Sequence, residues 1–353
     1  MKKSSVLAIG CGGAGNRLLN EFLELDRRYT GIFMNTNMAE MEDLKHFDRE
    51  RRCFYIPNAD GTGKDRKLAE QYIKDEAAKF VEMIKKFTNQ NHIIFLTSAN
   101  GGTGSKASVM LPRLIKAACP DKTISLIATY PNIDESDIDF ENSLDFWEEV
   151  KTCRKRKFID NVRFIDNNKP YSEDEINKLA MKELDDSFNI MEGKLDSSDV
   201  TRYHVSNGYN VVLRLDSDVS SIKRVIDMAL SKSVYYIPEN LECDVLIGNI
   251  NSKSHSLADI REKIECYDFS KFNTKTEGDS LLLIGGCIMP TEAIELVQES
   301  LEDLKNRRNR RQREEDIVIK RNKKETVKKE KETSSRVTSE DLDAMYEDDS
   351  FWD

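Results

Sequence analysis

Two glycine-rich segments, each between an apolar run and a helix-like segment, constrain the fold of this chain most. The first, Gly10-Cys11-Gly12-Gly13-Ala14-Gly15-Asn16, follows the apolar run 5–9, and the second, Asn100-Gly101-Gly102-Thr103-Gly104-Ser105, follows the apolar run 92–97. A glycine loop between a buried parallel strand and a helix start offers backbone N–H groups and partial positive charge to an anion. The two loops therefore predict an α/β fold that binds a di- or triphosphate.

The first loop also satisfies the G-x-G-x-x-G spacing of NAD-binding proteins, which makes a NAD-dependent oxidoreductase one alternative. Such proteins carry an acidic residue at the end of the second strand to hold the ribose. Here the second apolar run, 31–34, ends in Asn35-Thr36-Asn37, with no carboxylate before Glu40. NAD is therefore disfavoured. A non-enzymatic binding module, in which the glycines serve only as turns, is another alternative.

Taken together, the two loops resemble those of the tubulin/FtsZ superfamily of GTPases, whose nucleotide loops follow one another in a fixed order. Its first loop, G-x-G-G-x-G-N, matches residues 10–16, and its signature G-G-G-T-G-[ST]-G matches 100–106 with the first and last glycines replaced. Asn37 stands where a loop of the Asn-Thr-Asp type has aspartate. The resemblance implies that GTP is bound by Gly12, Gly13, Asn16, Asn35, Thr36, Asn100, Gly101, Gly102, Thr103, Gly104 and Ser105.

The remaining loops of the superfamily can also be matched in order. Gly63 and Lys64 belong to a glycine-containing loop that would lie near the γ-phosphate, and Glu135 has the position of a ribose-binding glutamate. Asn167 aligns with an asparagine that reads guanine. Asp185, in a predicted helix over 173–192, aligns with a guanine-facing pair and would accept hydrogen bonds from donors that adenine lacks.

The acidic segment after that helix matches the superfamily pattern N-x-D-x-x-D through Asp196 and Asp199, with Lys194 in place of the asparagine. The resemblance implies that these two carboxylates are catalytic. They would reach across a head-to-tail contact to the nucleotide of the next subunit and polarise the attacking water, with Mg²⁺ carried by the nucleotide phosphates. An ordinary capping cluster at a helix start is the alternative.

Composition narrows the class of protein further. The formal net charge of −10 argues against a protein that coats nucleic acid over its whole surface. The sequence has no apolar run long enough for a transmembrane helix, and its first residues lack the apolar core of a secretion signal. Its seven cysteines include no C-x-x-C pair. We expect a cytoplasmic protein with reduced thiols and no membrane partner.

The order of apolar runs and glycine loops predicts a doubly wound, parallel α/β sheet followed by a smaller mixed α/β domain. Apolar runs at 209–215, 243–248 and 280–286 are the strands expected in the second domain, with a helix over 219–230 capped by Asp218. The expected organisation is a GTP-binding domain at 1–172, a connecting helix at 173–193, a second (activation) domain at 194–290, a C-terminal helix at 291–318 and a charged, disordered tail at 319–353.

The end of the chain separates charge into a basic block, 305–332, and an acidic block, 337–353. Three features make the chain most similar to the superfamily members that segregate plasmid or phage DNA. They are this charged tail, the loop at 63–66 and the signature loop that begins with Asn100 in place of glycine. That resemblance implies a filament of head-to-tail subunits whose tail binds a DNA-binding adaptor on centromere DNA. Tyr346, Phe351 and Trp352 would form a short binding motif. An FtsZ-like cell-division GTPase is the alternative within the superfamily.

Overall fold

The computed structural model describes residues 2–57 and 61–330, with residues 312–330 described by their backbone alone. The described residues divide into two units, with the division between Leu301 and Glu302. The first unit contains the sheet, the predicted nucleotide-binding residues and the two predicted catalytic aspartates.

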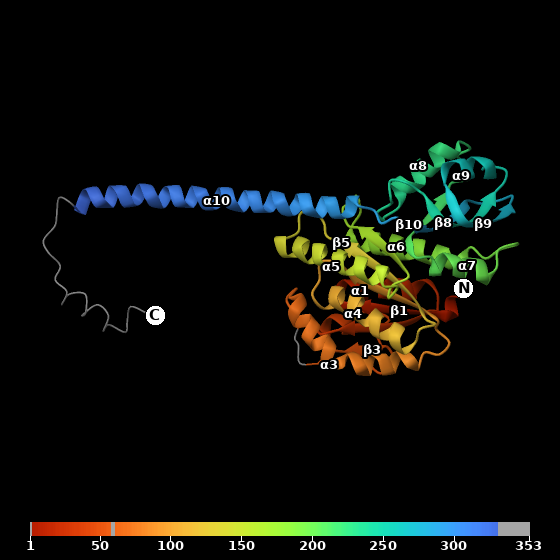
Figure 1. The fold of residues 1–353 in the computed structure, drawn as a ribbon, viewed down its shortest axis with the longest axis horizontal. Coiled ribbons are helices and arrows are strands. Elements are labelled where there is room, and N and C mark those ends of the chain that lie inside the picture. The colour runs from red at the N-terminus through yellow and green to blue at the C-terminus, as the bar shows by residue number, and fades with distance from the viewer. Residues whose placement is uncertain (1, 58–60, 331–353) are drawn as a thin grey trace. The chain divides into compact units, whose positions relative to one another are not determined.

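The first unit is built on a sheet with helices packed along it (Figure 1). The sheet has ten strands, of which the first six in sheet order are parallel. Their order across the sheet is 3-2-1-4-5-6, that of a doubly wound fold, so the predicted fold class is confirmed. The central strands are buried on both faces, which explains their nearly continuous apolar sequences. The six are β3 (Cys53–Tyr55), β2 (Thr30–Asn35), β1 (Val6–Cys11), β4 (His92–Ser98), β5 (Thr123–Tyr130) and β6 (Asn161–Asp166).

Helices cover the parallel strands in two groups. One contains α1 (Gly12–Leu25) and α6 (Glu173–Asn189), which pack together, and the other contains α3 (Arg66–Lys85), α4 (Thr103–Ala118) and α5 (Asp137–Lys155). The chain builds the sheet outward from β1, first toward β3 and then toward β6. Because each crossover is right-handed, this change of direction places the two groups of helices on opposite faces of the sheet. Two short helices, η1 (Lys3–Ser5) and α2 (Ala39–Glu42), complete this part.

The same sheet continues through the region predicted as a second domain. It consists of β7 (Gly208–Leu215), β10 (Ser280–Cys287), β8 (Cys243–Asn251) and β9 (Cys266–Lys275), in that order, with α7 (Ser197–Val205), α8 (Ile222–Lys232) and α9 (Leu257–Lys263). The junction is narrow, because β6 and β7 pair only through Asn161–Gly208 and Val162–Tyr209. The edge strand β9 was not predicted from the sequence.

The predicted start of the helix over 219–230 was wrong. The helix begins at Ile222, with Ser221 rather than Asp218 as its N-cap. The preceding segment is held in a turn, because the backbone N–H of Asp218 donates to the Asp216 carboxylate and the Val219 carbonyl hydrogen-bonds to His255 Nε2. These local bonds delay the helix by three residues.

One hydrophobic core joins the two parts of the sheet on the face covered by α1 and α6. Phe22 of α1 and Leu184 of α6 belong to the same buried cluster as Tyr203 of α7 and Leu283 of β10. The helix α6 therefore shares its apolar side with both parts, as the predicted apolar stripe of a connecting helix requires.

The last helix, α10 (Glu292–Glu330), begins in the first unit and continues into the second. It extends past residue 318, where the predicted C-terminal helix ended. Residues 292–330 contain no glycine or proline and are rich in lysine, arginine and glutamate, which favour helix even without apolar packing. Tyr346, Phe351 and Trp352 lie outside the described residues. Among the described residues, no helix is long and apolar enough to cross a membrane.

Candidate active site

The loops that follow the parallel strands meet at the carboxyl edge of the sheet and border two adjoining cavities. One, of about 530 Å³, reaches from the first glycine loop to the start of α6, and the other, of about 250 Å³, lies between both glycine loops and the segment 61–64. The predicted nucleotide-binding residues that line them are Gly12, Gly13, Asn35, Thr36, Gly63, Lys64, Asn100, Gly101, Gly102, Thr103, Gly104, Glu135 and Asn167.

The two glycine loops touch each other, and this contact explains why glycine is needed there. A Cβ at Gly104 would lie 2.2 Å from the Cys11 carbonyl oxygen, and Gly12 has a φ of +70°. Helix α1 begins at Gly12 and helix α4 at Thr103, so two helix N-termini face the same smaller cavity. Their unpaired N–H groups and partial positive charge favour an anion at this point.

Three hydroxyl groups gather beside the two glycine loops. Thr103 Oγ1 lies 3.0 Å from Thr36 Oγ1 and 3.3 Å from Thr62 Oγ1. Thr36 is fixed by its neighbour, because its backbone N–H donates to Asn35 Oδ1 over 2.9 Å and Asn35 in turn donates to Glu40. The cluster is suited to phosphate oxygens or to the water shell of a bound metal ion.

Two predicted nucleotide-binding residues, Asn16 and Ser105, do not line the cavities. Asn16 is fully buried, and its Nδ2 donates to the Met34 carbonyl at the end of β2 over 3.2 Å. The Ser105 hydroxyl points back into its own helix start and hydrogen-bonds to the Gly101 carbonyl. The structure therefore does not bring these two side chains to the cavities, and both support the loops from behind.

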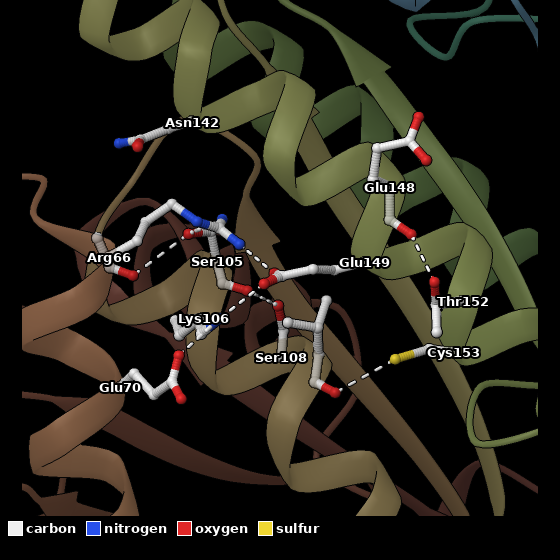
Figure 2. Close-up of polar contacts among 12 residues, drawn as sticks. Arg66, Glu70, Ser105, Lys106, Ser108, Asn142, Glu148, Glu149, Thr152 and Cys153 are labelled. Carbon is white, nitrogen blue, oxygen red and sulfur yellow. Dashed lines mark hydrogen bonds and ion pairs between the residues drawn. The ribbon is translucent and has the colours of Figure 1, made fainter.

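An ion-pair network holds the signature loop from the side of α3 and α5 (Figure 2). Arg66 donates to Ser105 Oγ over 2.7 Å and pairs with Glu149. Lys106 bridges Glu149, at 2.6 Å, and Glu70, at 3.0 Å. Arg66 is almost fully buried, so this arrangement fixes the position of the loop. Sequence reasoning missed Arg66, whose only signal was a basic residue directly after the glycine-containing loop.

Charged side chains surround Asn100 at one wall of the larger cavity. Asn100 Nδ2 donates to Glu135 Oε2 over 2.9 Å and to Asp139 Oδ1 over 3.0 Å, and Lys64 Nζ lies 2.5 Å from the same Asp139 oxygen. Burial and the neighbouring Asp139 carboxylate raise the pKa of Glu135. Burial opposes ionisation of Asp139 too, but hydrogen bonds from Lys64 and Ser136 hold its pKa below the ordinary value. The charge of Lys64 thus stabilises the ionised forms of both Asp139 and Glu135.

The other end of the larger cavity is formed by the segment between β6 and α6. Asn167, Tyr171 and Ile176 line it, and the Tyr171 side chain is 45% exposed. Asn167 Oδ1 is a buried acceptor with no hydrogen-bond partner among the described residues. An exposed ring, an aliphatic side chain and an unused acceptor suit a planar base that carries N–H donors. Tyr171 and Ile176 were not predicted as site residues.

The structure does not bring Asp185 to this site. Its carboxylate accepts from Lys3 Nζ at 2.6 Å and from the Tyr29 hydroxyl. Lys3 precedes β1, so Asp185 lies at the amino edge of the sheet, whereas the cavities lie at the carboxyl edge. Helix α6 starts beside the cavity and runs away from it. Only its first turns can contribute to the site.

Asp196 and Asp199 also lie at the amino edge. They precede and begin α7, whose last turn is tied to the start of β6 by the hydrogen bond from Asn161 Nδ2 to the His204 carbonyl. Helix α6 has 17 residues, so its two ends are about 25 Å apart. In a single chain the two carboxylates are therefore remote from both cavities.

Both carboxylates form the capping box that was the alternative interpretation of this segment. Asp196 accepts from the backbone N–H groups of Ser198 and Asp199, and Asp199 accepts from that of Asp196 over 2.8 Å. The hydrogen bond from Ser198 and the two backbone bonds lower the pKa of Asp196 to about 2. The Asp196 side chain is 63% exposed, whereas that of Asp199 is buried. Capping and a second role are compatible, since Asp196 remains open to a partner.

The described residues contain no group of histidine, cysteine, aspartate and glutamate side chains that could hold a metal ion. The cavities instead offer the hydroxyls of Thr36 and Thr103. This fits Mg²⁺, which keeps several waters and is commonly held through substrate phosphates and few protein groups.

Sequence comparison agrees with the loops and with the strand order. Residues 5–172 match the GTPase domain of the tubulin/FtsZ family. The chain therefore carries a GTPase domain of the tubulin/FtsZ family, as the order of its loops predicted. Over a longer range, the chain is 23% identical to the tubulin-like protein TubZ of Clostridium botulinum C phage, covering 90% of this chain and 88% of that protein.

Solved structures extend the similarity to the fold beyond the matched domain. The C-terminally truncated TubZ of Clostridium botulinum phage c-st superimposes with a TM-score of 0.79 at 22% identity, over 86% of this chain and 99% of that one. A GTPγS-form protofilament of TubZ from Bacillus thuringiensis serovar israelensis gives a TM-score of 0.72 at 14% identity, over 89% of this chain and 94% of that one. The similarity in fold therefore extends well beyond residues 5–172.

Proposed function

We propose that this protein is a GTP-hydrolysing, self-assembling filament protein whose active site is completed at a head-to-tail contact between subunits. One subunit supplies the two cavities, and the next supplies Asp196 and Asp199. The observation that carries the proposal is the position of these two groups at opposite edges of one sheet. Stacked subunits in one orientation bring such edges together, and this is the heterologous contact that generates filaments.

In the proposed complex, the two glycine loops bind the phosphates through backbone N–H groups, and Thr36 and Thr103 face phosphate oxygens or metal-bound water. Glu135 accepts from the ribose hydroxyls. Asn167 Oδ1 accepts from the N–H donors of guanine, which adenine does not present in the same place, and Tyr171 packs against the base. Bound Mg²⁺ would neutralise charge on the phosphates.

Hydrolysis at such a contact needs only a positioned water and a stabilised leaving group. The water oxygen attacks the γ-phosphorus while the bond from that phosphorus to the bridging oxygen breaks, which leaves GDP and phosphate. Asp196 and Asp199 of the next subunit orient the water through hydrogen bonds. Because these carboxylates arrive with the neighbour, hydrolysis is coupled to assembly.

For the cellular role, we propose the segregation of plasmid or phage DNA in the cytoplasm. The support is the similarity to TubZ proteins together with the charged end of the chain. In this proposal the tail binds a TubR-like DNA-binding adaptor on centromere DNA, and polymer turnover moves the cargo.

The test is the rate of GTP hydrolysis as a function of protein concentration, with light scattering on the same samples and ATP and NAD as controls. A GTP-specific rate that rises above a threshold concentration, together with scattering, is expected. A rate strictly proportional to protein concentration without scattering would overturn the proposal, since the site would then be complete in one subunit.

A further inference from the structure

The acidic turn, residues 192–199, is held from one side by a single face of the edge strand β9. Alternate residues of a strand share a face, so Phe269, Lys271 and Asn273 point the same way. Phe269 lies under the guanidinium of Arg202 in α7 at 4.6 Å, Lys271 pairs with the aspartates, and Asn273 bonds to the backbone of the turn. One strand thus contacts this segment at three successive points.

The start of the turn is fixed by a chain of amide side chains. Asn273 Oδ1 accepts from the backbone N–H of Lys194 over 3.2 Å, and Asn273 Nδ2 donates to Asn249 Oδ1 over 3.0 Å. Asn249 in turn donates to Glu192. Gly193 has a φ of +56°, and a Cβ there would lie 2.2 Å from Asn273 Oδ1. The turn and the strand are therefore fitted closely to each other.

Lys271 supplies the positive charge that faces the two aspartates. Its Nζ lies 2.7 Å from Asp199 Oδ2 and 3.8 Å from Asp196 Oδ2, and its side chain is 36% exposed. The hydrogen bond to Asp199 raises the pKa of Lys271. The contacts of Lys194 and Arg202 described above, to Asn273 and to Phe269, do not involve these carboxylates.

An acidic turn that must approach a triphosphate faces a physical difficulty, because both partners are anionic. Two uncompensated carboxylates would be repelled by the phosphates over several ångströms at ordinary ionic strength. A lysine fixed on the turn offsets this repulsion. It also holds one carboxylate in a defined rotamer, and such preorganisation is needed to orient a water.

We propose that Lys271 is a positioning residue of the interface-completed site: its ammonium group fixes Asp199 and compensates the charge of the acidic turn, so that the turn can dock against the nucleotide of the next subunit. The inference rests on the proposed function. It assigns a role in catalysis to the strand β9, which lies at the far edge of the sheet from the GTPase domain.

The experiment compares full-length wild type with Lys271→Ala, Lys271→Arg and Lys275→Ala. Lys275 is the matched control, because it lies on the same strand face, four residues on. For each protein we would measure binding of a fluorescent GTP analogue, the threshold concentration for assembly, and GTP hydrolysis per assembled subunit at low and high salt. Thermal unfolding would verify that each variant is folded.

The expected result for Lys271→Ala is unchanged analogue binding, a higher assembly threshold and a rate per assembled subunit about fivefold lower, as for loss of a partly exposed ion pair. Lys271→Arg should retain most of the activity. Added salt should bring the threshold of Lys271→Ala closer to that of wild type, because salt screens the remaining repulsion. A purely structural role would not produce this salt response.

Two outcomes would overturn the inference, and the behaviour of the wild-type protein distinguishes them. If Lys271→Ala behaves like Lys275→Ala while wild type shows a threshold, the role of Lys271 is wrong and the proposed function stands. If wild type itself hydrolyses GTP without a threshold, the proposed function fails and the inference falls with it.

Discussion

The carboxyl and amino edges of the sheet differ in how many of their described polar groups lack a hydrogen-bond partner. At the carboxyl edge, two helix N-termini and bare glycine backbone face open cavities, and Asn167 Oδ1 is a buried acceptor with no partner among the described residues. At the amino edge, the carboxylates of Asp196 and Asp199 accept from backbone N–H groups, and Lys271 pairs with Asp199, while the Asp196 side chain stays exposed. The first edge is shaped for a small anion, whereas the second is a folded, charged surface. The first edge is therefore suited to a ligand, and the second is suited to contact with another subunit, as the proposed function requires.

The largest expected effect comes from a substitution at the carboxyl edge that removes nucleotide binding and leaves the amino edge intact. Gly104→Val places side-chain atoms against the Cys11 carbonyl, so the two glycine loops must move apart. We expect about a hundredfold loss of GTP affinity, since a hydrogen bond to a charged group contributes about 1.5–3 kcal/mol and more than one would be lost. Binding of a fluorescent GTP analogue measures it. Gly278→Ala is the control, because Gly278 lies in a remote turn where the nearest atom to an added Cβ, Lys275 Nζ, is 3.8 Å away.

The second prediction concerns the amino edge. Asp199→Ala should lower GTP hydrolysis by about a hundredfold or more, as for loss of a preorganised polar group, and leave nucleotide affinity unchanged. The control is Asp259→Ala, which removes an acid from the first turn of another capped helix, α9. Normal hydrolysis by Asp199→Ala would show that the amino edge has no part in catalysis.

Glu135→Gln should have a smaller effect, which depends on pH. The pKa of Glu135 is raised in the folded protein, so this carboxyl favours the folded state at low pH and disfavours it once it ionises. Glu135→Gln should therefore raise the unfolding temperature of the nucleotide-free protein at neutral pH, with the gain disappearing below the ordinary pKa of a glutamate. Thermal unfolding at pH 4 and pH 7 (about the two limits of this range) measures it. A pH-independent gain would contradict the assignment.

Removal of residues 305–353 should affect neither nucleotide binding at the carboxyl edge nor assembly through the amino edge. We expect the truncated protein to bind GTP and assemble as wild type does, but to lose association with a DNA-bound adaptor. Co-sedimentation with an adaptor–DNA complex measures the association. Retained association in the truncated protein would place the partner site elsewhere in the chain.

Much of the fold and of the carboxyl edge could be predicted because the signals there are local. Buried parallel strands have continuous apolar sequences, and the glycine loops follow them directly, as at Gly10–Asn16. The strand order alone would have suited a dinucleotide-binding protein equally well. The order of the loops identified the family instead.

The structure differs from the sequence-based expectation where the direction of a side chain decides its role. Ser105 is in the signature loop but turns toward Arg66, and Asp185 is in the right helix but three turns from the site. Neither direction follows from the alignment of a loop. Strand β9 was missed because an edge strand with half-exposed residues lacks a clear apolar period.

The central claim, that one active site is shared by two subunits, is tested most directly by mixing two inactive variants. Gly104→Val lacks the nucleotide site and Asp199→Ala lacks the catalytic carboxylate, so each alone should hydrolyse almost no GTP. In a mixed filament, a Gly104→Val subunit can present its intact acidic turn to the nucleotide of an Asp199→Ala subunit. The account predicts that the mixture regains hydrolysis that neither variant has. Continued inactivity, with both variants found together in the sedimented polymer, would contradict it.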